Sequence, residues 1–371
     1  MKFLTPLVEG ARLALWASSH SRPRAAYVGG WLGHNNLGDE ALFDACKVLF
    51  SGVSLYPLNV CRETVAMARL TRAFHCAMLA GGTIINKNNS GLMRAQRMLD
   101  IAKCCYVFGT GVADPAFWQG RTLRDGNPWS NSISQWREVL EQCAYVGVRG
   151  PLSQRILMDA GVRKPEVIGD PVLAFADCSL GRRGVEKTLG LNMGVSGGYM
   201  WGESEESVFR RLTRLASLAK GDGWTVRWFV VWPEDYAVTE SAAKESGTDE
   251  HIHAVYMDHT RYLHLVSKTR VFVGMKLHAV ILATCAGVPS IMLEYRPKCR
   301  DYMESIRQGQ LCQRVDQFKP EDILDRVRDI DGNREQCVAD MATAISQLQA
   351  VQRLRADQVM ARIMTVSDQI A

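Results

Sequence analysis

Three cationic side chains, one histidine and one carboxylate fall within one short stretch of the C-terminal half of the sequence. Lys276 and His278 follow an apolar, β-prone run, and Glu294, Arg296 and Lys298 follow the next such run. A small apolar helix is expected between the two runs, so both polar loops should lie at the carboxyl ends of neighbouring parallel strands, where open α/β sheets bind ligands. The start of that helix would present free N–H groups and a positive dipole end to an anion. We therefore predict an active site in this stretch.

Each of these residues also has a purely structural interpretation. A histidine beside an apolar helix is often a satisfied core residue, and a lysine at a strand end is often only solvated. The grouping of charges at strand ends, rather than any single residue, favours a functional site.

Two other strand ends carry residues that suit a ligand site. Arg149 lies between an apolar strand and a helix that begins at Pro151, so it is a further cation at a strand-to-helix junction, with a surface salt bridge as the alternative. Gly81 and Gly82 follow a buried strand, where glycine marks either tight packing or a close approach of the backbone to a ligand.

A glycine-rich segment follows the first apolar strand, residues 25–30, and leads into a helix. Asn35, Asn36 and Asp39 offer short polar side chains near the start of that helix. The glycine spacing matches a phosphate-binding loop, but Asp39 and Glu40 stand where lysine and serine or threonine would be needed, and their charges would repel a phosphate. Asp39 is therefore either a helix cap or a residue that contacts a sugar hydroxyl.

The length and composition favour two α/β domains. The chain has 371 residues, of which 47% are hydrophobic and 22% charged, as in ordinary globular proteins that fill two cores. A polar, glycine-bearing run at 177–187 predicts the boundary, with domains at 1–180 and 181–371 and helices at the C-terminal end. The net charge of +5 is mild, and without a clustered basic face it does not suggest a nucleic-acid partner. It suits small anionic substrates or the neighbourhood of an acidic membrane surface.

The cysteines indicate a reducing compartment. There are 11 of them, an odd and scattered set without C-x-x-C pairs, so we expect a cytoplasmic protein without disulfides. No zinc-like grouping with histidine is present, and we expect no structural or tightly bound transition metal.

Two segments away from these loops have predicted roles. Apolar residues at helical spacing in 1–19 predict an amphipathic helix that packs on the body of the protein rather than in a membrane interface, because its polar face lacks lysine and arginine. Residues 117–134 show no sustained period and predict a long surface loop that acts as a lid.

The ordered set of motifs resembles the polysaccharide pyruvyl transferase family. The matching pieces are Gly30, NLGDEAL at 36–42, GGT at 81–83, GTG at 109–111, VRGPLS at 148–153, IGDPVL at 168–173, GMKLHA at 274–279 and EYRPK at 294–298. The resemblance implies two Rossmann-like domains that face a cleft, a GT-B-like α/β fold, with the acceptor on the N-terminal domain and the donor on the C-terminal one.

The resemblance also implies a reaction. Family members move the enolpyruvyl part of phosphoenolpyruvate to a sugar and leave a pyruvate ketal, so phosphoenolpyruvate would be the donor substrate and no cofactor would be needed. The acceptor would be a sugar of a polysaccharide or of its lipid-linked or nucleotide-linked precursor, reached in the cytoplasm or at the inner membrane face. The acceptor's identity, the bridged hydroxyls, the ketal stereochemistry and the oligomeric state are left open.

The family reaction distributes roles over the candidate residues. The trianionic donor needs cations, which Arg149, Lys276 and Lys298 supply, with Glu294 beside them. His278 is the side chain suited to proton transfer at neutral pH, and Asp39 would hold or deprotonate the acceptor hydroxyl. Further acceptor contacts are assigned to Asn35, Asn36, Gly82 and Thr83.

One residue departs from the family pattern. The family usually has arginine at the position of Lys276, and lysine keeps the charge but not the planar fork that grips a carboxylate or phosphate with two bonds. Two other functions therefore stay open, a GT-B glycosyltransferase that uses a nucleotide sugar and a saccharide-binding protein without catalysis.

Overall fold

The structure is a computed structural model that describes residues 6–20, 23–58, 61–86, 89–102, 104–119, 121, 130–182, 186–202 and 204–368. The chain divides into two compact units. Unit 1 contains Met1–Gly33, Leu42–Ala174 and Gln349–Ala371, and unit 2 contains His34–Ala41 and Phe175–Leu348. The predicted boundary after residue 180 treats each half as one continuous stretch, whereas each unit here includes a short segment from the other half of the chain.

Unit 1 is built on a parallel six-stranded sheet with the order β2-β1-β3-β4-β5-β6. Its strands are β1 (Arg24–Val28), β2 (Ser54–Pro57), β3 (Cys76–Ala80), β4 (Cys104–Thr110), β5 (Tyr145–Val148) and β6 (Glu166–Val167). The helices are α1 (Pro6–Ser19), α2 (Leu37–Leu49), α3 (Arg62–Leu70), α4 (Asn89–Ile101), α5 (Pro115–Trp118), α6 (Ser130–Leu140) and α7 (Pro151–Asp159), followed by the 3-10 turn η1 (Pro171–Phe175). The first turn of α2 is assigned to unit 2, and so is the last residue of η1.

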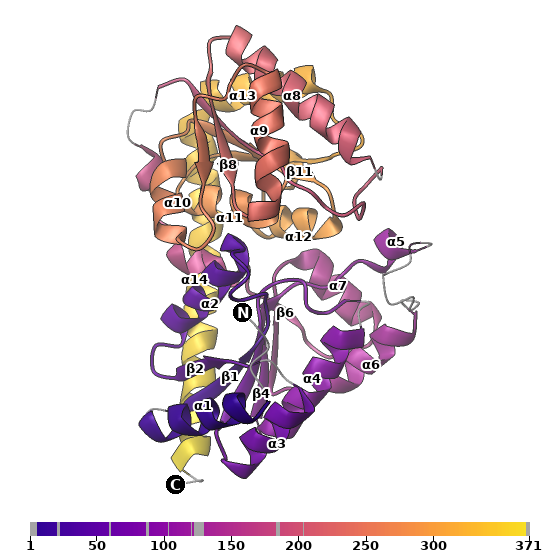
Figure 1. The fold of residues 1–371 in the computed structure, drawn as a ribbon, viewed down its shortest axis with the longest axis vertical. Coiled ribbons are helices and arrows are strands. Elements are labelled where there is room, and N and C mark those ends of the chain that lie inside the picture. Colours follow the sequence, from indigo (N-terminus) through magenta and orange to yellow (C-terminus); the bar gives the residue numbers. More distant parts are fainter. Residues whose placement is uncertain are drawn as a thin grey trace. The chain divides into compact units, whose positions relative to one another are not determined.

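Alternate residues of these strands fill two separate cores, one on each face of the sheet. Ala26 and Leu79 pack with residues of α1, α3, α4, α6 and α7, whereas Tyr27 and Met78 pack with α2 and with the end of the long C-terminal helix α14 (Arg334–Asp368). Because side chains of a strand point alternately to its two faces, the nearly continuous apolar runs of the sequence produce a sheet covered by helices on both sides (Figure 1).

Unit 2 has a second parallel sheet, with the order β12-β11-β10-β7-β8-β9. Its strands are β7 (Thr188–Asn192), β8 (Thr225–Val230), β9 (Ile252–Ala254), β10 (Val271–Gly274), β11 (Ser290–Glu294) and β12 (Cys312–Arg314). The helices are α8 (Glu205–Gly221), α9 (Tyr236–Glu245), α10 (His259–Val266), α11 (Leu277–Cys285), α12 (Pro297–Ser305), α13 (Pro320–Gly332) and the first part of α14, with short 3-10 turns η2 (Leu180–Arg182), η3 (Pro233–Asp235) and η4 (Gly309–Leu311).

The strand order places a topological switch point in each sheet. From β7 the chain moves outward to β8 and β9 and then returns to β10 on the other side of β7. In unit 1 it moves from β1 to β2 and returns to β3 on the other side of β1. Ligands of open α/β sheets bind outside the carboxyl ends of the strands at such points. The loops after β7 and β10, and those after β1 and β3, are thus the places to look for a site.

The N-terminal helix is confirmed as a packed helix. Leu13 and Ala17 of α1 are buried in the core of unit 1, beside Val65 and Ala68 of α3. The predicted lid at 117–134 differs at both ends, because Phe117 and Trp118 are buried residues of α5 and α6 begins at Ser130. Residues 120 and 122–129 lie outside the described residues. The sequence interpretation did not recognise α12, in whose first turn Lys298 lies, nor β12.

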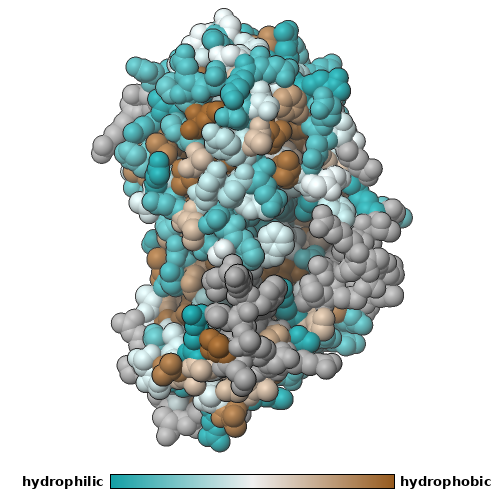
Figure 2. Space-filling view, in the orientation of Figure 1, coloured by the Kyte–Doolittle hydropathy of each residue, from teal (hydrophilic) through white to brown (hydrophobic). Residues whose placement is uncertain are grey.

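None of the helices within the described residues is long and apolar enough to cross a membrane. Figure 2 shows hydrophilic residues spread over the described part of the face in view, with hydrophobic residues in small separate groups.

Candidate functional site

Asn192 joins three strand ends at the switch point of unit 2. Its side chain is completely buried at the end of β7, where Oδ1 accepts the backbone N–H of Lys276 at 2.8 Å and Nδ2 donates to the carbonyl of Phe229 in β8 at 2.9 Å. The turn between β10 and α11 is therefore fixed to the ends of β7 and β8. Asn192 was not among the predicted site residues, although a single amide that ends an apolar strand is a visible signal.

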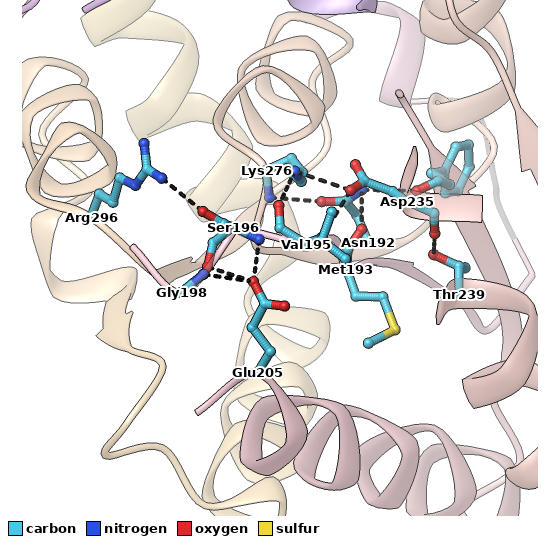
Figure 3. Close-up of polar contacts among 11 residues, drawn as sticks. Asn192, Met193, Val195, Ser196, Gly198, Glu205, Asp235, Thr239, Lys276 and Arg296 are labelled. Atoms are coloured by element: carbon cyan, nitrogen blue, oxygen red, sulfur yellow. Dashed lines mark hydrogen bonds and ion pairs between the residues drawn. The ribbon is translucent and has the colours of Figure 1, made fainter. Parts of the chain in front are cut away.

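The ammonium group of Lys276 is held within unit 2 (Figure 3). Nζ donates to the carbonyl of Val195 at 2.7 Å, lies 3.1 Å from Oδ1 of Asp235, and stands 5.0 Å from the ring centre of Trp232. The side chain of Lys276 is 14% exposed and that of Asp235 is 0% exposed. A β-carbon on Gly194 would lie 2.0 Å from Cε of Lys276, so the glycine makes room for the lysine stem.

Asp235 is the carboxylate that the sequence interpretation missed. It ends η3, just beyond β8, and its Oδ1 also accepts the backbone N–H of Val195 at 2.9 Å. Burial raises the pKa of Asp235 above its ordinary value, while Lys276 and the hydrogen bond from Val195 act in the opposite direction. The pair Asp235–Lys276 thus holds the loop after β7 against the loop after β8.

His278 lies in the first turn of α11 and is packed against the start of α2. A β-carbon on Gly38 would lie 2.1 Å from Nδ1 of His278 and 2.8 Å from its Cβ. The backbone N–H of Leu37 donates to the carbonyl of Val231 at 3.1 Å, which fixes this turn of α2 to the end of β8. Since the φ of Gly38 is not in the left-handed region, glycine is required here by space rather than by conformation.

The other candidates of this glycine-rich segment are in the same unit as His278. Asn35 is exposed with φ of 55°, Asn36 accepts the N–H of Gly38 on Oδ1 at 3.0 Å, and Asp39 is half-buried in the first turn of α2. Asn36 therefore acts at the helix start. Asp39 was expected in the N-terminal domain, and the segment that carries it instead belongs to unit 2.

The polar residues at the end of β11 and just after it are engaged in local contacts. Glu294 is 3% exposed, and it accepts from Trp201 at 3.1 Å and pairs with Arg300 at 2.9 Å. The Lys298 ammonium lies 4.9 Å from the ring centre of Tyr295. Arg296 donates to two carbonyls of the loop after β7. Lys276, Arg296 and Glu294 thus contact that loop. A role of Lys298 or Glu294 in donor binding remains a prediction.

Arg149 is completely buried in unit 1, at the carboxyl end of β5. Its NH1 donates to the carbonyl of Gly82 and its NH2 to Oγ1 of Thr83, both at 3.2 Å. A β-carbon on Gly111 would lie 2.1 Å from NH2. The structure therefore brings together Arg149 and the predicted acceptor residues Gly82 and Thr83, and places a guanidinium directly beneath the loop at the switch point of this sheet.

The candidates thus form two groups. Lys276, His278 and Asp39 belong to unit 2, and Arg149 belongs to unit 1 with Gly82 and Thr83. The convergence of Arg149, Lys276 and His278 on one donor stays a prediction. Among the residues that the structure describes, no group of three or more His, Cys, Asp or Glu side chains is placed to hold a metal ion.

Two Rossmann-like units, each with a parallel six-stranded sheet, define the GT-B class of fold, and solved structures agree. The chain is similar to a protein assigned as a UDP-N-acetylglucosamine 2-epimerase from Listeria monocytogenes, with TM-score 0.59 and 11% identity over 94% of this chain and 98% of that one. It is similar to a glycosyltransferase from Rickettsia africae, with TM-score 0.56 and 9% identity over 93% and 99% of the two chains. A UDP-GlcNAc 2-epimerase from Neisseria meningitidis, bound to UDP-GlcNAc, gives TM-score 0.54 and 9% identity over 92% and 99%.

The sequence itself is more specific. Residues 33–297 match the family model of polysaccharide pyruvyl transferase, and the chain belongs to this family. No curated protein matches the sequence at a significant level.

Proposed function

We propose that the protein transfers the pyruvyl group of phosphoenolpyruvate to two hydroxyls of one sugar in a polysaccharide or in its lipid-linked or nucleotide-linked precursor. The observation that carries the proposal is the family match over residues 33–297, a range that contains Asp39, Arg149, Lys276 and His278. We place the reaction in the cytoplasm or at the inner face of the membrane.

The reaction needs a proton on carbon and a balanced transfer of two hydroxyl protons. Protonation of the donor's methylene carbon makes the phosphate-bearing carbon electrophilic, and one sugar hydroxyl adds to it. Phosphate leaves, and the second hydroxyl closes the ketal. Of the two hydroxyl protons, one replaces the proton given to the methylene carbon and the other leaves with phosphate.

His278 is the group that we assign to this proton transfer, because its imidazole lies at the start of α11, at the switch point of unit 2. Asp39, in the first turn of α2, is assigned to the acceptor hydroxyl. Arg149 is assigned to an anionic group of the donor, since its buried guanidinium carries a charge beneath the Gly82–Thr83 loop.

Incubation of the protein with phosphoenolpyruvate and a panel of acceptor glycans tests the proposal. We expect release of inorganic phosphate and a glycan mass increase that corresponds to one pyruvate ketal. A panel that covers lipid-linked, nucleotide-linked and polymeric acceptors and gives neither product would count against the proposal.

The role of His278 has its own test. We expect His278→Ala to lower turnover by at least 100-fold, in the range of general acid–base catalysis, while the circular dichroism spectrum and the thermal midpoint stay near those of the wild type. A variant with near-normal turnover would remove His278 from the mechanism.

The alternative is a glycosyltransferase that uses a nucleotide sugar, which the GT-B neighbours favour only through their common fold. A rise of the thermal midpoint with UDP, and none with phosphoenolpyruvate, would support this alternative.

A further inference from the structure

The loop after β7 directs several hydrogen-bond donors at one carboxylate (Figure 3). Oε1 of Glu205 accepts the backbone N–H of Ser196 at 2.5 Å, the hydroxyl of Ser196 at 2.8 Å and the N–H of Gly198 at 3.4 Å. The backbone N–H of Gly197 also helps to lower the pKa of the Glu205 carboxylate. We call residues 195–198 the anion loop.

The backbone conformation explains this convergence. Gly197 and Gly198 have φ of 65° and 79°, in the left-handed region that glycine adopts without strain. Successive residues in such turns point their N–H groups to one side and form a concavity that binds anions, as in many phosphate sites. The carboxylate of Glu205 therefore occupies a position that suits an oxygen of a phosphate or carboxylate ligand.

The other side of the anion loop is held by two cations. Nζ of Lys276 donates a hydrogen bond to the carbonyl of Val195 at 2.7 Å, and NH2 of Arg296 donates to the carbonyl of Ser196 at 3.1 Å. Arg296 also donates through Nε to the carbonyl of Tyr199, just beyond the loop, at 2.6 Å. Because Lys276 and Arg296 hold these carbonyls, the loop conformation does not depend on Glu205 alone.

The anion loop is accessible. Gly197 and Gly198 are exposed, and a β-carbon on Gly198 would meet no described atom within 4 Å, while one on Gly197 would meet only Tyr199 at 4.0 Å. The loop also follows β7, the strand next to the switch point of this sheet. A ligand can therefore approach from solvent at the end of the sheet where ligands bind.

The printed links between Glu205 and the anion loop, among the residues that the structure describes, are made by its side chain. It is the first residue of α8, after the N-cap Ser204, and its side chain is half-buried. Burial raises the pKa of Glu205, but the hydrogen bonds from Ser196, Gly197 and Gly198 lower it, and the net pKa lies below the ordinary value. The carboxylate is thus charged at neutral pH, and a rotation of its side chain would leave the donors open.

We propose that the anion loop binds a phosphate group of a substrate, and that Glu205 is an internal competitor that fills the loop until the phosphate displaces it. A phosphate carries more negative charge and more acceptor oxygens than one carboxylate, so it can form stronger hydrogen bonds with the same donors. Two substrates would carry such a group, the donor phosphoenolpyruvate and a phosphate-linked acceptor. The identity of these two substrates rests on the proposed function, whereas the binding of inorganic phosphate by the loop can be tested without it.

Isothermal titration of inorganic phosphate into Glu205→Ala, Glu206→Ala and the wild type tests the proposal. Glu206 is the matched control, because it is the neighbouring exposed glutamate of the same helix turn and pairs with Arg210 on the helix surface. We expect Glu205→Ala to bind phosphate about tenfold more tightly than the wild type, and Glu206→Ala to differ by less than twofold, a contrast that a general charge effect would not produce. Equal affinities of the two variants would overturn the proposal.

Two further variants locate the effect. Glu205→Gln keeps the side-chain size and removes the charge, so it should show an intermediate gain even if Glu205→Ala folds poorly. Adding Ser196→Ala to Glu205→Ala removes one hydroxyl donor and should reverse part of the gain. A loss of phosphate binding in Glu205→Gln would show that the glutamate builds the loop instead of competing for it, and would reject the proposal.

Titrations with phosphoenolpyruvate, UDP and pyruvate identify the source of the group. A gain on Glu205→Ala for phosphoenolpyruvate alone assigns the loop to the donor, and a gain for UDP alone assigns it to a phosphate-linked acceptor. A gain for pyruvate as large as that for phosphate would overturn the assignment to phosphate, because pyruvate offers only a carboxylate.

Discussion

At the scale of single residues, glycines set the space around the candidate side chains. Gly38, Gly194 and Gly111 lie against His278, Lys276 and Arg149, and a β-carbon at any of these glycines would come within 2.1 Å of the neighbouring side chain. Real side chains never approach so closely, so each glycine allows its partner to adopt the observed position.

Gly38→Ala tests this point at His278. Alanine favours a helix over glycine by about 1 kcal/mol, but here its methyl group must displace the whole imidazole side chain. We expect pyruvyl transfer to fall at least tenfold. Gly332→Ala is the control, since a β-carbon there meets nothing within 4 Å, and it should leave the rate unchanged. Equal rates for the two variants in a phosphate-release assay would show that His278 tolerates displacement.

The buried pair of Lys276 and Asp235 predicts a strong dependence of stability on both partners. Lys276→Met leaves a completely buried carboxylate without its cation, which costs about 3–5 kcal/mol of unfolding free energy. Replacing both residues, with Asp235→Asn as the second change, should recover at least half of that loss.

Urea unfolding measures both values. Lys244→Met is the control, because Lys244 pairs with Glu240 at the surface. The side chain of Lys244 is 62% exposed and that of Glu240 is 39% exposed, and such pairs contribute less than about 1 kcal/mol. A double variant as unstable as Lys276→Met would mean that the lysine acts through packing rather than through charge.

At the scale of elements, one carboxylate at the end of α8 links this helix to α13. Asp222, the C-cap of α8, accepts from Arg328 of α13 at 2.9 and 3.1 Å and from the indole of Trp224 at 3.1 Å. The hydrogen bonds from Arg328, followed by that of Trp224, lower the pKa of Asp222 from 3.8 to about 2.

This pKa shift predicts how stability depends on pH. A folded-state pKa below the unfolded one means that the stabilisation is complete above about pH 4 and is lost as the pH falls toward 2. We expect the urea midpoint of Asp222→Asn to depend less on pH in that range than the midpoint of the wild type. Asp249 is exposed, and Asp249→Asn should leave the pH dependence of the midpoint unchanged. The difference should shrink in 1 M salt, because Asp222 is exposed enough for screening.

At the scale of the whole molecule, the last helix completes the core of unit 1. Ala356, Val359 and Ile363 of α14 are buried beside Phe50 and Tyr106, although they lie almost 200 residues after the last strand of that sheet. Arg355 adds two hydrogen bonds to Glu166 of β6, at 2.7 and 2.8 Å. The second part of α14 is therefore a component of the core of unit 1.

Ile363→Ala tests how much α14 contributes to this core. A buried isoleucine replaced by alanine loses its packing and leaves a cavity, so the unfolding free energy should fall by about 2–5 kcal/mol. Leu354, on the same helix, is 54% exposed, and Leu354→Ala should change the value by less than about 0.5 kcal/mol. Similar values for both variants in urea unfolding would mean that α14 does not contribute to this core.

The sequence by itself determined most of the local elements and the class of fold, although α12 and β12 were not recognised. Apolar runs with polar residues and glycines at their ends indicated parallel strands and helices, and the order of the motifs indicated the family, because both depend on neighbouring residues in the chain. The opening of α11 after Gly274, with Lys276 and His278 at its start, is one such local feature.

Only the tertiary structure decided which residues meet. The pairing of Lys276 with Asp235, the hydrogen bonds of Asn192 and the contact of His278 with Gly38 join segments separated by about 40 to 240 positions, and no local pattern encodes such contacts. The same holds for the return of α14 to unit 1 and for Arg149 beneath Gly82. These contacts arise when strand order and burial bring distant chain segments to one sheet edge, which is a property of the packed molecule.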